Sequence, residues 1–223
     1  MSQINQQGLD KLMDDIKTIK STLDESGSLL RRLFLPAPLR LVGIIGGLSV
    51  IFFCLAFYFL NARYGSHAGI PVGIKYTLYC LLFADWILMA VLKNKKIIRS
   101  MKVVDPSYSL FDVFKYLHSG RMLHMYLPVV IIIFTLSGLA VYNNNLEHII
   151  PILSIGVGIM YNYMGLILRI KEYLISGYWM ILTGLLAAVF TSVSPLIDCS
   201  VSFGIGLLLF GLVRISPDET AKE

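Results

Sequence analysis

Residues 40–60 read RLVGIIGGLSVIFFCLAFYFL, an apolar run with no charged residue after Arg40. A helix needs about 20 largely apolar residues to cross a bilayer core of about 30 Å. Five more runs of this kind follow, and together the six cover more than half of the chain. The predicted spans are 40–60, 72–92, 122–142, 146–168, 174–194 and 197–214. The sequence therefore predicts an all-α integral membrane protein with a six-helix transmembrane bundle over 40–214.

The bulk composition leaves little chain for a soluble domain. The 223 residues are 56% hydrophobic, and the mean hydropathy is +0.72. The polar segment 1–28 lacks the basic, apolar and small-residue pattern of a cleaved signal peptide. We therefore expect one membrane domain whose first span is a permanent anchor, followed by a short cytoplasmic tail, 215–223.

Lysine and arginine set the expected orientation, because cationic loops resist translocation. If the N-terminus is inside, all 19 of these residues except Arg63 and Lys75 fall on the inner side. Both termini are therefore predicted to be cytoplasmic, and the expected location is a bacterial inner (cytoplasmic) membrane. The net charge of +5 lies beside the spans, where it favours anionic lipid of the inner leaflet rather than nucleic acid. The basic residues expected to face lipid are Arg31, Arg32, Lys93, Lys95, Lys96, Arg99 and Lys102.

A helical seam precedes the first span. Its apolar residues recur at alternating steps of three and four: Leu9, Leu12, Ile16, Ile19 and Leu23. Charged residues lie between them, which predicts an amphipathic, coiled-coil helix within 1–28. A helix of little more than two heptads is marginal alone in water, so its seam needs a cover. The cover is a second copy of the chain or a cytoplasmic protein partner; the alternative is docking on its own membrane domain or on the bilayer.

Two further segments are expected on the cytoplasmic side. Residues 29–39 form an interfacial linker in which Pro36 and Pro38 break the backbone. The loop 93–121 carries a basic run and then, from Ser109, a capping box that starts a short amphipathic helix. That helix is suited to lying along the inner leaflet or to packing under the bundle.

Asp85 is the one acidic residue well inside a predicted span, and ionisable groups inside the membrane are functional candidates by default. Five polar residues are expected at similar depths: Ser49, Tyr161, Asn162, Tyr163 and Thr183. One hypothesis is an intramembrane polar site where Asp85 binds a proton or cation and Asn162 and the tyrosines form a hydrogen-bonding wall. The alternative is that Asp85 is protonated or hydrogen-bonded and only orients the helices.

Small residues four apart recur on the predicted spans. The pairs are Gly43/Gly47, Ser154/Gly158, Gly184/Ala188 and Ser200/Gly204. Each pair places small residues on one helix face, where backbones can approach closely. This pattern favours a compact bundle.

The cysteines and histidines predict no metal site and no cofactor. Cys54, Cys80 and Cys199 are isolated, with no Cys-x-x-Cys pair. The first two lie inside spans and are expected to act as small apolar residues, whereas Cys199 lies near the expected outer surface without an obvious partner. The four histidines lie at span ends or in loops, and none is paired at the i, i+4 spacing of a helical metal site.

The usual enzyme signatures are absent from the sequence, among them the Gly-x-Ser-x-Gly elbow, the His-Glu-x-x-His helix and the phosphate-binding glycine loop. The leading hypothesis is a non-enzymatic subunit that anchors or scaffolds a membrane-associated assembly through its N-terminal coil and basic loop. The second is a small channel or transporter around Asp85 and Asn162. The third is a membrane-sensing signalling or defence subunit.

Overall fold

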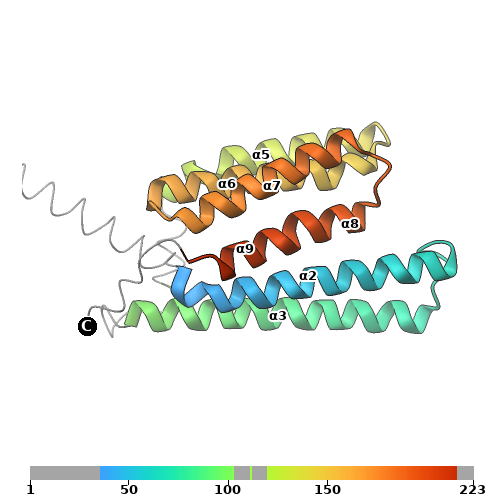
Figure 1. Cartoon of the computed structure of the whole chain (residues 1–223), viewed down its shortest axis with the longest axis horizontal. Helices are drawn as coiled ribbons and strands as arrows, with labels where there is room; N and C mark the ends of the chain where they lie inside the picture. The colour runs from blue at the N-terminus through green and yellow to red at the C-terminus, as the bar shows by residue number, and fades with distance from the viewer. Residues whose placement is uncertain (1–35, 103–110, 112–119, 215–223) are drawn as a thin grey trace, which may run out of the picture.

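The computed structural model describes residues 36–102, 111 and 120–214. Every element in this part of the chain is helical (Figure 1). The elements are α2 (Pro36–Tyr64), α3 (Val72–Lys102), α5 (Gly120–Tyr142), the short 3₁₀ helix η1 (Leu146–His148), α6 (Ile149–Leu168), α7 (Lys171–Val189), α8 (Pro195–Cys199), the π-helix η2 (Ser200–Ile205) and α9 (Gly206–Leu212).

Among the described residues, five helices are long and apolar enough to cross a membrane. They cover Leu39–Tyr64, Val72–Arg99, Leu146–Leu168, Lys171–Val189 and Pro195–Leu212. The predicted span 122–142 corresponds to α5, whose apolar part, Tyr126–Tyr142, is shorter than the others. The predicted all-helical fold is confirmed, the five long apolar helices fit a membrane protein, and the count of six spans stays a prediction.

Several predicted segments lie outside the described residues. They are the coil within 1–28, the basic pair Arg31 and Arg32, and the tail 215–223. The predicted helix from Ser109 also lies outside them, apart from Phe111, which is exposed.

The first helix begins earlier than the predicted span. Pro36 is the first residue of α2, so Pro36 and Pro38 both lie within its first turn. The first four N–H groups of a helix have no partner within the helix, so prolines cost no hydrogen bond there. The backbone break expected within 29–39 therefore does not interrupt the chain between Pro36 and Arg40.

The second helix ends later than the predicted span. α3 continues to Lys102, so the basic run that was assigned to the loop 93–121 forms its last turns. Lysine and arginine have high helix propensity, and cations near a helix C-terminus interact favourably with the helix dipole. With 31 residues, α3 is about 46 Å long at 1.5 Å per residue, well beyond a bilayer core.

The helices pack in a definite order. Figure 1 shows the last segment, from α8 to α9, lying between α2 and the pair formed by α6 and α7. α3 packs against α2, and α5 packs against α6. The most extensive contact is between α6 and α7, which are joined by the tight turn at 169–170. The core is therefore centred on α7 and the last segment, with α3 and α5 at its flanks.

Glycines bring the backbones of the core helices into contact. A Cβ atom added to Gly47 of α2 would lie 2.7 Å from the carbonyl oxygen of Gly204, and one added to Gly158 of α6 would lie 2.7 Å from that of Gly177. Ser154, on the same face of α6, donates a hydrogen bond of 2.7 Å to the Met180 carbonyl of α7. The close packing predicted from small residues four apart is confirmed at these contacts.

The last segment is not a regular α-helix. Its middle, Ser200–Ile205, is π-helical, which turns carbonyl groups away from the usual i to i+4 pattern. The indole N–H of Trp179 on α7 donates a hydrogen bond of 2.9 Å to the carbonyl of Val201 in this segment. A side chain of α7 therefore ties the π-helix to the core.

Candidate functional site

Asp85 lies at the contact between α3 and α2. It is half-buried, and its carboxylate accepts a hydrogen bond of 3.0 Å from the Ser49 hydroxyl. Its neighbours Phe83 and Trp86 are exposed, so on this helix the acidic group is turned to the protein while large apolar groups are turned outward. A hydrogen-bonded carboxyl at this place can hold a proton or orient the two helices.

Asn162 lies in a different part of the bundle. Its side chain sits against Gly177 of α7, so closely that a Cβ atom on that glycine would overlap the amide oxygen. Among the described residues, nothing donates a hydrogen bond to this buried oxygen. Asn162 therefore belongs to the α6–α7 contact, whereas Asp85 belongs to the α2–α3 contact.

The remaining predicted polar residues also separate. The ring of Tyr161 packs with the rings of Tyr173 and Phe210, at centroid distances of 5.4 and 6.2 Å. Tyr163 is exposed. The hydroxyl of Thr183 donates to the carbonyl of Trp179 on its own helix, at 2.8 Å.

Of the six residues of the predicted polar site, the structure joins Asp85 and Ser49 by a hydrogen bond. It gives Asn162, Tyr161 and Thr183 other neighbours. The depth argument found the right level for Ser49 and Asp85, but depth contains no information on which way a side chain points around its helix.

A buried ion pair lies at one end of the bundle. The guanidinium of Arg40, at the start of α2, is 3.6 Å from the carboxylate of Glu172, in the first turn of α7. The side chain of Glu172 is 0% exposed and that of Arg40 is 11% exposed. A carboxylate near the N-terminus of a helix is also favoured by the helix dipole. Arg40 and Glu172 therefore tie the beginning of the first helix to the beginning of α7.

Sequence reasoning missed this pair because it assigned Glu172 to the loop before a span starting at 174. The structure starts α7 at Lys171, which places Glu172 inside the helix and inside the core. One signal was available. Arg40 and Glu172 carry opposite charges and each precedes an apolar run that is expected to begin on the same side of the membrane.

An aromatic cluster lies next to the ion pair along α7. Tyr173 follows Glu172 directly, and its ring is 4.7 Å from that of Phe210 on α9. Together with Tyr161 these rings join α6, α7 and α9. The end of the bundle that begins α2 and α7 is therefore closed by packed side chains from four helices.

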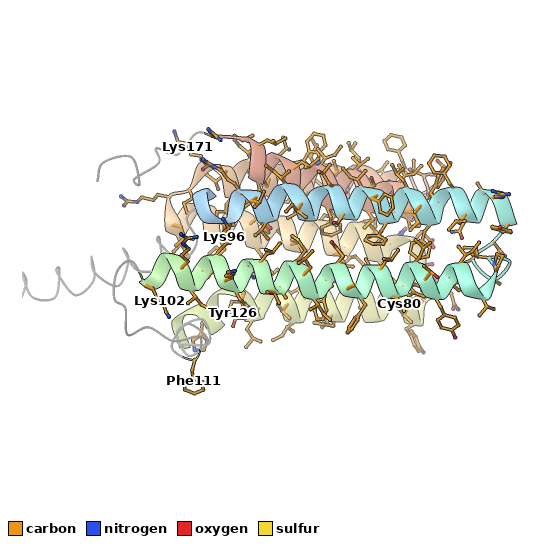
Figure 2. The ribbon with its side chains drawn as sticks, turned by 90° about the horizontal axis from the view of Figure 1, so that it is seen from below. Cys80, Lys96, Lys102, Phe111, Tyr126 and Lys171 are labelled. Carbon is orange, nitrogen blue, oxygen red and sulfur yellow. The ribbon has the colours of Figure 1, made fainter. Side chains whose placement is uncertain are left out.

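Basic residues gather at the same end. Figure 2 shows Lys96, Lys102 and Lys171 at one end of the molecule, away from Cys80. Lys93, Lys95, Arg99 and Lys102 are exposed, and Lys96 is half-buried. A positive surface on the last turns of α3 suits the head groups of anionic lipids.

Within the described part of the chain, no group of three His, Cys, Asp or Glu side chains is arranged to hold a metal ion. Comparisons of the chain with protein-family models, with curated proteins and with solved structures found no match.

Proposed function

We propose that this chain is a non-enzymatic subunit of a bacterial inner membrane that anchors a membrane-associated assembly. In this proposal the coil within 1–28 and the basic loop 93–121, whose basic run forms the last turns of α3, make the contacts on the cytoplasmic side, with a second copy of the chain or with a soluble protein. The observation that supports it is the close contact between helix backbones inside the bundle. Backbones touch at Gly47 and Gly204 and again at Gly158 and Gly177, which suits a rigid anchor better than a conduit.

The ion pair of Arg40 and Glu172 supports the same proposal. Arg40 lies close after the segment that carries the proposed contacts, and Glu172 lies in the core. Separating a buried pair of this kind is costly, because each buried charge then loses the compensation that the other provides. A pull on the N-terminal segment is therefore carried into α7 rather than only into the first helix.

Native mass spectrometry of the protein in nanodiscs tests the proposal. The full-length chain is expected to be oligomeric or to retain a soluble partner, and the chain without residues 1–28 is expected to be a plain monomer. The same loss is expected when Leu12, Ile16 and Ile19 are all replaced by Glu, because charges break the apolar seam. The matched control is Lys17→Glu, which changes charge on the polar side of the same helix. Normal assembly of the triple variant would overturn the proposal.

A small channel or transporter is the second candidate, and the hydrogen bond between Asp85 and Ser49 favours it. In this proposal Asp85 carries the transported proton or cation. The test measures proton or cation flux in proteoliposomes with an imposed gradient. Asp85→Asn is expected to abolish flux while assembly stays intact, and Asp198→Asn, at the other end of the bundle from the basic residues, is the matched control. Equal flux in the Asp85→Asn variant and the unchanged protein would remove this candidate.

A further inference from the structure

Two of the three cysteines lie together in the fold. The side chains of Cys54 on α2 and Cys199 on α8 lie close enough to interact. Cys199, which has no obvious partner in the sequence, therefore has one in the structure. The third, Cys80, is exposed on α3.

The packing of α2 on the last segment also brings Cys54 and Cys199 toward each other. The two run antiparallel: Gly43 lies against Leu207 and Gly211, while Gly204 lies against Gly47 and Ile51. Toward the C-terminus of α2, the next residue on this face after Ile51 is Cys54, three positions later. Because the last segment is antiparallel to α2, the same direction runs from Gly204 toward the N-terminus of that segment, through the π-helix to Cys199. The register set by four glycines thus brings the two cysteines to the same level.

The pair lies near one end of the last segment. Both cysteines are half-buried rather than enclosed in the core. Cys199 is only four positions from Pro195, where α8 begins, so it lies about 6 Å along the helix from that end. Figure 1 shows α2 and α3 extending past the start of α8 at this end of the bundle. The contact of Gly204 with Ile51 keeps α2 and the last segment close about one turn away from the cysteines, and a disulfide requires close backbones.

We propose that Cys54 and Cys199 form a redox-active dithiol that closes to an intramolecular disulfide by exchange with an incoming disulfide. One thiol loses its proton and attacks a sulfur of the incoming disulfide, which releases one thiolate and leaves a mixed disulfide. The second thiol loses its proton and attacks the protein sulfur of that mixed disulfide, which releases the other thiolate. The two departing thiolates take up the two protons, so the incoming disulfide is reduced to two thiols and the protein dithiol is oxidised.

The consequence is a covalent link between the first helix and the last segment. In the reduced protein these two are held by packing at this level, with Cys54 and Cys199 as free thiols. In the oxidised protein α2 and α8 can no longer separate. The state of the pair therefore sets whether this end of the bundle can open, without changing the buried ion pair at the opposite end.

The test uses the full-length protein in nanodiscs, treated with oxidised glutathione and then measured by intact mass and by mapping of unreduced peptides. The expected result is a peptide that joins Cys54 to Cys199, with the loss of the mass of two hydrogen atoms and no glutathione on either of these two cysteines. Cys80→Ser, the matched control, is expected to behave in the same way. Cys54→Ser and Cys199→Ser are each expected to lose the linked peptide and the mass decrease.

Three results would overturn the proposal. They are an unchanged mass after oxidation, glutathione adducts without the linked peptide, and a disulfide that involves Cys80. Because each is read from the covalent state of the cysteines, none depends on the anchoring function or on transport.

Discussion

At the residue scale, the buried pair of Arg40 and Glu172 joins the first helix to α7. Removing two charges from water costs several kcal/mol per ion, and their attraction repays this only while both are present. Glu172 is 0% exposed, so its charge depends on partners within the protein, and Arg40 and the start of α7 are among them. The hydrogen bond of Asp85 with Ser49 is a weaker contact, since hydrogen bonds between membrane helices contribute about 0.6 kcal/mol on average.

The change Glu172→Ala is therefore expected to lower the free energy of unfolding by about 3–5 kcal/mol, because it leaves the guanidinium of Arg40 buried without its carboxylate. The double change of Arg40 and Glu172 to Met is expected to recover most of that loss. Denaturant unfolding in mixed micelles measures both. The control is Glu147→Ala, at an exposed position of η1. A double variant as unstable as the single one would show that the charge imbalance is not the cause.

At the element scale, the helices α6 and α7 pack closely because glycines at their contact carry no side chains. Gly177 meets both Asn162 and the Gly158 carbonyl, so its contact leaves no room for a methyl group. The carbonyl of Met180, one turn along the same helix, accepts a hydrogen bond from the hydroxyl of Ser154. The two helices are therefore fixed in rotation as well as in distance.

Gly177→Ala is expected to destabilise the protein by about 1–3 kcal/mol, because the added carbon forces Asn162 and the facing backbone apart. Gly138→Ala is the matched control, since nothing lies within 4 Å of a Cβ atom placed there on α5. The control is expected to be neutral or stabilising by up to about 1 kcal/mol. Thermal unfolding of the two variants in the same detergent compares them. Equal losses in both variants would mean that the close contact at Gly177 does not set the effect.

At the scale of the whole molecule, the flanking helices differ from the core. No residue in the apolar window of α3 is buried, and α5 makes most of its contacts with α6. Membrane helices at the edge of a bundle face lipid, which is as apolar as their own side chains. The arrangement therefore suits a bundle whose core is closed and whose flanks meet the bilayer.

Labelling of single cysteines in cells tests the orientation and the count of spans. In a chain with its native cysteines replaced by serine, cysteines at Ser66 and Asn143 are expected to react with an impermeant maleimide from outside. Cysteines at Lys102 and Arg214 are expected to react only after the membrane is opened, because the positive-inside distribution keeps both inside. A residue at Asn143 that is protected like Lys102 would mean that α5 does not cross.

The shared level of Asp85 and Ser49 and the close packing of the glycines were within reach of the sequence. Depth along antiparallel helices and spacing of small residues are one-dimensional properties that the chain order carries directly. The neighbours of Asn162 could not be predicted from the sequence, because helix rotation decides which side of a span a residue faces. Asn162 turned to Gly177, and Asp85 turned to Ser49.

By itself the sequence determined that this protein is a bundle of apolar helices suited to a membrane, since the length and apolarity of a run are enough to satisfy the bilayer. Only the tertiary structure decided the partners across helices: Arg40 with Glu172, and Cys54 with Cys199. These pairs join segments far apart in the chain, and they arise from the rotation and register that backbone contacts between glycines impose. No local pattern encodes that register, because it exists only once the helices pack.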